Sequence, residues 1–249
     1  MRLPYSAPAH PPLETDSRIL LGPGPSNVDP QVLQAMAASM VGHLDPFFLE
    51  TMDRIQDLLR YAFQSQNPLT IPVSGTGSAA METAMANLIE PGDPVLVCVN
   101  GFFGERMADM ARRYQGEVRI LQRPWAEVFT LEEIEAELKA RPAKVVAIVH
   151  GETSTGALQP LEGMAEMVRE HGGLLVVDAV ATLGGVPLLV DELGIDVCYT
   201  GSQKCLSVPP GLGPITLGPR AAAALAERKT PVGSLYFDLT GVQKYWGKE

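Results

Sequence analysis

The sequence predicts an α/β fold with a mostly parallel open sheet and helices on both faces. Short β-rich segments alternate with longer segments whose apolar residues recur at helical spacing, which is the pattern of βαβ units. Two strand-like runs, 145–149 and 174–177, are apolar at every position, as central parallel strands should be. The length of 249 residues suits one large α/β domain or two small ones.

Local signals place the elements along the chain. A proline-rich polar stretch, 1–18, predicts an extended arm, and the Gly-Pro alternation at 22–25 excludes a helix or a central strand. Asp29-Pro30 is a helix start with an N-cap and a proline at the first helical position. The predicted helices are 31–40, 47–64, 79–89, 102–115, 130–140, 161–171 and 219–228. The predicted strands are 69–73, 95–99, 117–121, 144–149, 174–177, 195–199 and 213–217.

Charge and cysteine usage limit the kinds of partner. Lys and Arg total 19 against 29 Asp and Glu, and the net charge of −10 argues against binding nucleic acid or an anionic membrane. The three cysteines, Cys98, Cys198 and Cys205, show no metal-type spacing, and a disulfide framework is not expected. The N-terminus lacks the apolar segment of a signal peptide, and no apolar run approaches a membrane span. We therefore expect a cytoplasmic protein.

Two ionisable residues follow predicted strands at the edge where ligands of such sheets bind. Lys204 comes just after the run 195–200, and burial would lower its pKa so that a neutral amine could attack an aldehyde. Asp178 ends an apolar strand, where a carboxylate needs a cation such as a protonated pyridine nitrogen. The alternatives are a surface lysine on a loop and an aspartate that caps a helix.

Residues that could bind a ligand follow three further predicted strands. The segment 74–78 opens a helix with glycines and hydroxyls, which suits a phosphate group or an ordinary N-cap. Phe103 could stack on a flat ring or pack in the core, and the polar loop 150–156 could line a site or only connect. Pyridoxal phosphate needs all five features: an anion site, a stacking face, a partner for its ring oxygen, an anion at its ring nitrogen and an amine for its aldehyde.

Six motifs, in this order and spacing, are similar to those of one enzyme family. They are Gly22-Pro23-Gly24-Pro25-Ser26, Gly42-His43-Leu44-Asp45-Pro46-Phe47, Ser74-Gly75-Thr76-Gly77, His150-Gly151-Glu152-Thr153-Ser154-Thr155-Gly156, Val177-Asp178-Ala179-Val180 and Gly201-Ser202-Gln203-Lys204. From about residue 19 onward the chain resembles the fold-type-I pyridoxal-phosphate enzymes. More narrowly, it resembles the class V aminotransferases of the alanine–glyoxylate and serine–glyoxylate or serine–pyruvate group.

The resemblance implies a role for each matching residue. Lys204 would hold the cofactor as a Schiff base and shuttle the proton as general acid and base, and Asp178 would pair with the ring nitrogen. The implied cofactor-binding residues are Thr76, Gly77, Ser78, Phe103, Ser154, Asp178, Val180, Gln203 and Lys204. Less directly, the resemblance places Pro25 at the substrate entrance and Gly42 and His43 in the neighbouring site of a homodimer. No metal is implied.

The resemblance also implies what the protein does and where the chain departs from its relatives. It implies transfer of an amino group from alanine or serine to glyoxylate or pyruvate by the domain 19–249. Relatives continue into a C-terminal small domain with a carboxylate-binding arginine, so we expect this chain to bind cofactor weakly and to leave Tyr236, Phe237, Tyr245 and Trp246 without packing partners. The alternatives are a desulfurase, a lyase or an aminophosphonate transaminase on the same scaffold, or a remnant without turnover.

Overall fold

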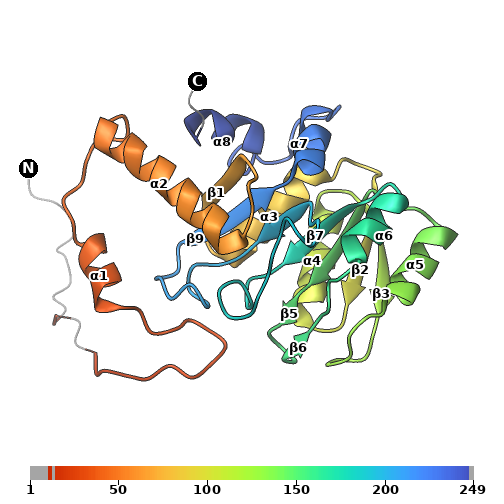
Figure 1. Ribbon diagram of the computed structural model, residues 1–249, viewed down its shortest axis with the longest axis horizontal. Helices are drawn as coiled ribbons and strands as arrows, with labels where there is room; N and C mark the ends of the chain where they lie inside the picture. The colour runs from red at the N-terminus through yellow and green to blue at the C-terminus, as the bar shows by residue number, and fades with distance from the viewer. Residues whose placement is uncertain (1–10, 13–14, 247–249) are drawn as a thin grey trace, which may run out of the picture.

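A seven-stranded sheet forms the centre of the computed structural model, which describes residues 11–12 and 15–246 (Figure 1). Its strand order is β1-β9-β8-β7-β4-β2-β3. The strands are β1 (Leu69–Ser74), β2 (Pro94–Val99), β3 (Glu117–Gln122), β4 (Val145–Val149), β7 (Leu174–Asp178), β8 (Val197–Tyr199) and β9 (Leu212–Leu217). Strand β9 is antiparallel to both of its neighbours, β1 and β8, and every other neighbouring pair is parallel, so the predicted mostly parallel sheet is confirmed.

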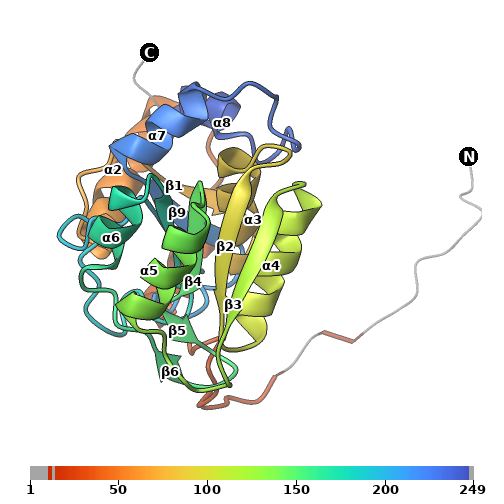
Figure 2. The same cartoon turned by 90° about the vertical axis from the view of Figure 1, so that its right-hand side faces the viewer.

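Helices cover both faces of the sheet, as the sequence predicts (Figure 2). One layer holds α3 (Gly77–Leu88), α4 (Phe102–Arg113), α7 (Pro219–Ala226) and α8 (Leu239–Trp246). The other holds the end of α2 (Pro46–Phe63), α5 (Leu131–Ala140) and α6 (Met164–Glu170). Alternate strand residues enter the two cores: Val95 and Val97 face the first layer, whereas Leu96 and Cys98 face the second. Among the described residues, no helix is both long and apolar enough to cross a membrane.

The structure differs from the prediction in several short elements. Helix α1 (Pro30–Met36) ends before the predicted residue 40 and buries none of its residues, so packing within this chain does not extend it. Helix α3 starts two residues before its predicted start, with Thr76 as N-cap. The hairpin of β5 (Gly151–Glu152) and β6 (Ala157–Leu158) was not predicted, because two-residue strands are too short to show alternation.

Helix α8 was also not predicted, and it changes the environment of the aromatic residues at 236–246. Phe237 and Trp246 pack against the core beside fully buried Leu239, whereas Tyr236 and Tyr245 are exposed. Asn87 of α3 anchors this segment, because its amide donates to the carbonyl of Phe237 at 2.7 Å. The expectation that these aromatics lack packing partners is therefore wrong for Phe237 and Trp246.

Candidate active site

Asp178 is the last residue of β7, beside Tyr199 of the parallel strand β8. It is 2% exposed, and its two carboxylate oxygens accept hydrogen bonds from the backbone N–H of Val180 at 2.8 Å and the hydroxyl of Tyr199 at 3.1 Å. Burial raises the pKa of Asp178 to about 6, although these two hydrogen bonds oppose the rise. Asp178 forms no ion pair with a described residue and no helix starts there, so its carboxylate suits a cationic ligand.

Lys204 lies in the turn that follows β8, under the loop 22–27. Its Nζ donates to the carbonyl of Pro23 at 2.7 Å, and the Oγ of Ser26 donates to the carbonyl of Lys204 at 2.8 Å. A Cβ at Gly24, where φ is +119°, would lie 2.4 Å from Cδ of Lys204, so only glycine lets the loop approach this closely. The predicted site loop therefore contacts the lysine, which is half-buried rather than fully desolvated.

The start of α3 meets the turn before Lys204. A Cβ at Gly77 would lie 2.8 Å from Cγ2 of Val180, and one at Gly201 would lie 3.2 Å from the backbone nitrogen of Gly77. The Oε1 of Gln203 is buried and has no hydrogen-bond partner among the described residues. The first N–H groups of a helix have no partner within it, so this corner offers donors to an anion. The structure thus brings together Gly77, Val180 and Gln203, which the sequence predicts to bind one ligand.

Glu152 was not predicted, although it connects two of the predicted site residues. It is 1% exposed, and its Oε2 accepts from the backbone N–H groups of Phe103 at 3.0 Å and Gly104 at 3.2 Å. Its Oε1 accepts from the hydroxyl of Ser154 at 2.7 Å, while the Ser154 oxygen accepts from the N–H of Phe102 at 3.0 Å. Glu152 therefore caps the positive end of α4 and fixes the positions of Phe103 and Ser154.

Two of the remaining predicted residues, Gly42 and His43, lie apart from these strand ends. Gly42 and His43 occupy an exposed turn before α2, and a Cβ at Gly42 would meet no atom within 4 Å. Pro25 belongs to the loop over Lys204, but its side chain is exposed. The structure of one chain therefore does not bring Gly42 and His43 to the site.

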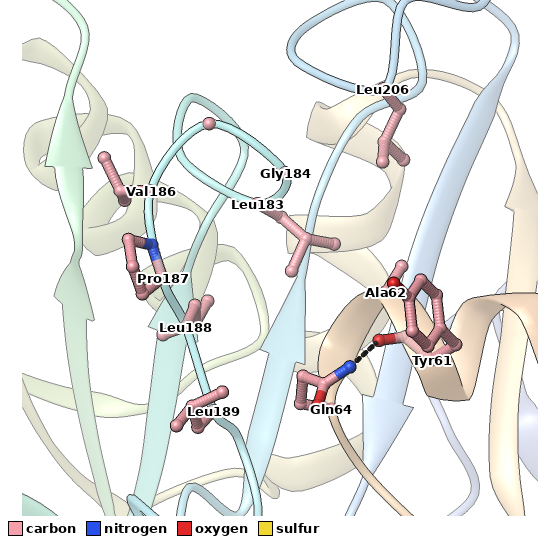
Figure 3. A pocket seen from close by; sticks show the side chains of 11 residues that line it. Tyr61, Ala62, Gln64, Leu183, Gly184, Val186, Pro187, Leu188, Leu189 and Leu206 are labelled. Atoms are coloured by element: carbon pink, nitrogen blue, oxygen red, sulfur yellow. Dashed lines mark hydrogen bonds between the residues drawn. The ribbon is translucent and has the colours of Figure 1, made fainter.

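A separate pocket of about 540 Å³ lies between the end of α2 and the loop 183–189 (Figure 3). Leucines line much of it, among them Leu183, Leu188 and Leu206. Its wall shows one labelled hydrogen bond, from the amide of Gln64 to the carbonyl of Tyr61 at 2.6 Å. None of the predicted site residues lines this pocket, so the candidate site remains the carboxyl edge of the sheet.

A family model described as Aminotransferase class-V matches residues 19–246, which include all of these strand ends. The chain belongs to this family. It is 45% identical over 238 residues to the alanine–glyoxylate aminotransferase of Rattus norvegicus, covering 96% of this chain and 58% of the rat protein. It is 41% identical over 252 residues to the (S)-ureidoglycine–glyoxylate transaminase of Bacillus subtilis (strain 168), covering 94% and 61%.

A solved structure of the family shows the same arrangement. The alanine–glyoxylate aminotransferase of Nostoc sp. superposes with a TM-score of 0.95 at 55% identity, covering 96% of this chain and 64% of the other. The chain thus spans roughly three fifths of the length of the relatives it matches. These matches agree with the resemblance that the sequence motifs predict.

Pyridoxal phosphate is the cofactor of class V aminotransferases, and this site fits it. The buried carboxylate of Asp178 forms no ion pair with a described residue, which suits a protonated ring nitrogen. The first N–H groups of α3, where Gly77 lies close to Gly201, offer hydrogen-bond donors to a phosphate in a narrow corner. Lys204 supplies an amine one strand away from Asp178.

Tyr199 is a further site residue that the sequence did not reveal, because an aromatic in an apolar strand is usually core. Its side chain is fully buried, and burial together with the charge of Asp178 raises the pKa of Tyr199, which keeps the hydroxyl a donor. Tyr199→Phe would leave one oxygen of Asp178 without a donor. We expect this variant to lose about 1–2 kcal/mol of unfolding free energy at pH 7, measured by urea denaturation without cofactor.

Tyr114→Phe is the matched control for this prediction. Tyr114 also donates to a carboxylate, Glu82, at 3.0 Å, but it is only partly buried and lies away from the strand ends. Water can replace this bond, so the control should lose about 0.5 kcal/mol or less. Equal losses in the two variants would show that the Tyr199 hydroxyl has no special role at Asp178.

Proposed function

We propose that the protein is a pyridoxal-phosphate-dependent aminotransferase that exchanges an amino group between a small amino acid, alanine or serine, and glyoxylate or pyruvate. The main supporting observation is that Asp178 ends β7 and Lys204 follows the neighbouring strand β8, so that both lie at the same edge of the sheet, beside the start of α3. The relatives named above support glyoxylate as the acceptor, because all three of their names contain it. Their amino donors differ, so the donor rests on the higher identity to the alanine enzymes.

Each residue of this edge has a role in the proposed reaction. When bound, the cofactor supplies an electron sink for the bond that breaks at the substrate Cα. Asp178 would pair with the ring nitrogen and keep it protonated. The amine of Lys204 would remove the proton from the substrate Cα and deliver it to C4′ of the cofactor. The N–H groups at Gly77 and Ser78 bind the phosphate, and Phe103 covers the ring and excludes water.

An assay of the purified chain with pyridoxal phosphate tests this proposal. We expect glycine to form from glyoxylate when alanine or serine is the donor, with loss of one amino group from the donor for each glycine made. Ureidoglycine should be compared as a third donor, because a relative is named for it. Binding of the cofactor without glycine formation from any donor would contradict the transaminase and favour the alternative of a binding protein without turnover.

A desulfurase on the same scaffold is less well supported by the geometry. Such a reaction needs a cysteine thiol that can reach the substrate, and Cys205 is the exposed cysteine among the described residues. Its Sγ donates to the carbonyl of Ala181 at 3.4 Å, and a Cβ at Gly185 would lie 2.6 Å from it. The thiol therefore packs on the loop 181–185 instead of extending into solvent beside Lys204.

We propose that the protein forms a homodimer, and the exposed apolar side chains of its N-terminal region support this. Helix α1 has no buried residue, and large apolar side chains around it are exposed, with Leu21 at 91% and Met40 at 95%. A second copy of the chain would cover them and bring the turn at Gly42 and His43 toward its partner's site. Light scattering at micromolar concentration should report twice the mass of 26.7 kDa.

The proposed location is the cytoplasm. Cys98 and Cys198 are buried and Cys205 is exposed, and all three are free thiols. Free thiols persist most readily in a reducing compartment. The net charge of −10 also supports a protein that acts on small molecules and binds neither nucleic acid nor an anionic membrane.

A further inference from the structure

Arg106 lies in the second turn of α4 and points across to the start of α3. Its Nη1 donates to the hydroxyl oxygen of Ser78 at 2.9 Å, and its guanidinium carbon lies 5.0 Å from the centre of the Phe103 ring. The ring of Phe102 is at 4.9 Å from the same carbon. The guanidinium thus connects the predicted phosphate-binding residue to the predicted stacking residue.

The charge of Arg106 is not neutralised by a neighbouring carboxylate. Among the described residues it forms no ion pair, although Asp and Glu outnumber Lys and Arg in the chain by 29 to 19. Its positive charge does reach the site, because it lowers the pKa of Asp178 against the larger effect of burial. A half-buried guanidinium without a carboxylate partner, beside a helix start, is suited to a phosphate.

The hydrogen bond to Ser78 also determines what the serine can do. A hydroxyl has one donor and two acceptor positions, and Arg106 uses one acceptor position. The O–H of Ser78 donates to no described residue, so it remains available to an anion. Donation from the guanidinium polarises that O–H and makes it a stronger donor.

We infer that Arg106 is the cationic positioning residue of the phosphate subsite: it balances the charge of the cofactor phosphate and orients the Ser78 hydroxyl toward it. This inference rests on the proposed function, because it concerns how the same site recognises pyridoxal phosphate. It extends the function by separating two parts of recognition. Asp178 and Lys204 recognise the ring and its aldehyde, whereas Arg106 and Ser78 recognise the phosphate.

The test compares pyridoxal phosphate with pyridoxal, which has the same ring and aldehyde but no phosphate. Binding of each to the 249-residue chain is followed by absorbance titration. We expect Arg106→Gln to weaken the binding of pyridoxal phosphate by about 10- to 100-fold and the binding of pyridoxal by less than about 3-fold. Arg112→Gln, which removes an exposed charge from the same helix, should change neither.

Two further variants separate charge and hydrogen bonding from packing. Arg106→Lys keeps the charge but loses the planar contact with the rings, so it should restore part of the phosphate preference. In a double-mutant cycle, Arg106→Gln should cost less in a Ser78→Ala background than in the parent chain, because the serine no longer transmits its effect. Additive effects would show that Arg106 does not act through Ser78.

The outcomes distinguish this inference from the proposed function. If the parent chain binds neither pyridoxal phosphate nor pyridoxal, both proposals are overturned. If the parent chain binds the phosphate form and Arg106→Gln weakens both ligands equally, Arg106 has only a structural role, and the inference alone fails. The inference also fails if Arg106→Gln binds pyridoxal phosphate as tightly as the parent does.

Discussion

Lys204→Ala is expected to abolish covalent attachment of pyridoxal phosphate and to lower the rate of amino transfer by at least about 10³-fold. The variant removes the amine that attaches the cofactor and moves the proton. It also removes the hydrogen bond from Nζ to the carbonyl of Pro23, which holds the loop 22–27. Lys204→Arg is the companion variant, because it keeps a cation near Pro23 but has no amine that attaches an aldehyde at neutral pH.

Borohydride reduction followed by peptide mapping checks the same prediction in the parent chain. The label should be found on Lys204 and absent from both variants. Lys144 is the control lysine, because its Nζ lies 2.6 Å from Oδ2 of Asp93, just before the start of β4 and therefore at the opposite edge of the sheet. A label on Lys144 or Lys229, or normal turnover in Lys204→Ala, would remove Lys204 from the proposed chemistry.

The strands were predictable because continuous apolar runs in the sequence indicate that they are buried. Runs such as 145–149 and 174–177 are apolar at every position, and both are fully buried central strands. Their order in the sheet was not predictable, because apolar runs show that a strand has neighbours but not which ones. The short helix α1 was predicted too long, since local propensity does not show that none of its residues is buried in this chain.

The candidate site was predictable where one residue suffices and unpredictable where two distant residues act together. Asp178 and Lys204 each follow a strand, and the parallel sheet alone brings such positions to one edge. Glu152 acts through the N–H of Phe103, which lies 49 positions earlier. Arg106 acts through Ser78, 28 positions earlier, and Tyr199 through its register with Asp178. None of these pairs has a signal in the sequence before the fold is known.

Asp178→Asn is expected to lower turnover by about 10²- to 10³-fold, because the ring nitrogen loses the anion that keeps it protonated. Without cofactor, the same substitution should raise the stability of the protein at pH 7. Burial raises the pKa of Asp178 from an ordinary 3.8 to about 6. Between these values the unfolded chain releases its proton before the folded one does, so the stability of the parent chain falls as pH rises through this window.

The stability that the parent chain loses across this window follows from the shift in the pKa of Asp178, and its upper limit is on the order of 2–3 kcal/mol. Asparagine does not titrate, and it keeps an oxygen that can accept from the N–H of Val180. The variant should therefore be at least as stable as the parent at pH 7, and its advantage should disappear below about pH 4. Urea denaturation at both pH values, together with steady-state turnover, measures the two effects separately.

Asp196→Asn is the matched control, because Asp196 is also a buried carboxylate next to β8 but lies at the other end of that strand. It pairs with Arg220 at 2.9 Å, and asparagine would leave this partly exposed guanidinium without its carboxylate partner, although burial also raises the pKa of Asp196 and so reduces the loss. Its replacement should therefore cost about 1 kcal/mol of stability and leave the turnover of the folded protein within a few-fold of the parent. A carboxylate that serves the fold loses stability when neutralised, whereas one that serves a cationic ligand loses turnover. Near-normal turnover in Asp178→Asn, or a loss of stability equal to that of the control, would place Asp178 in the first group.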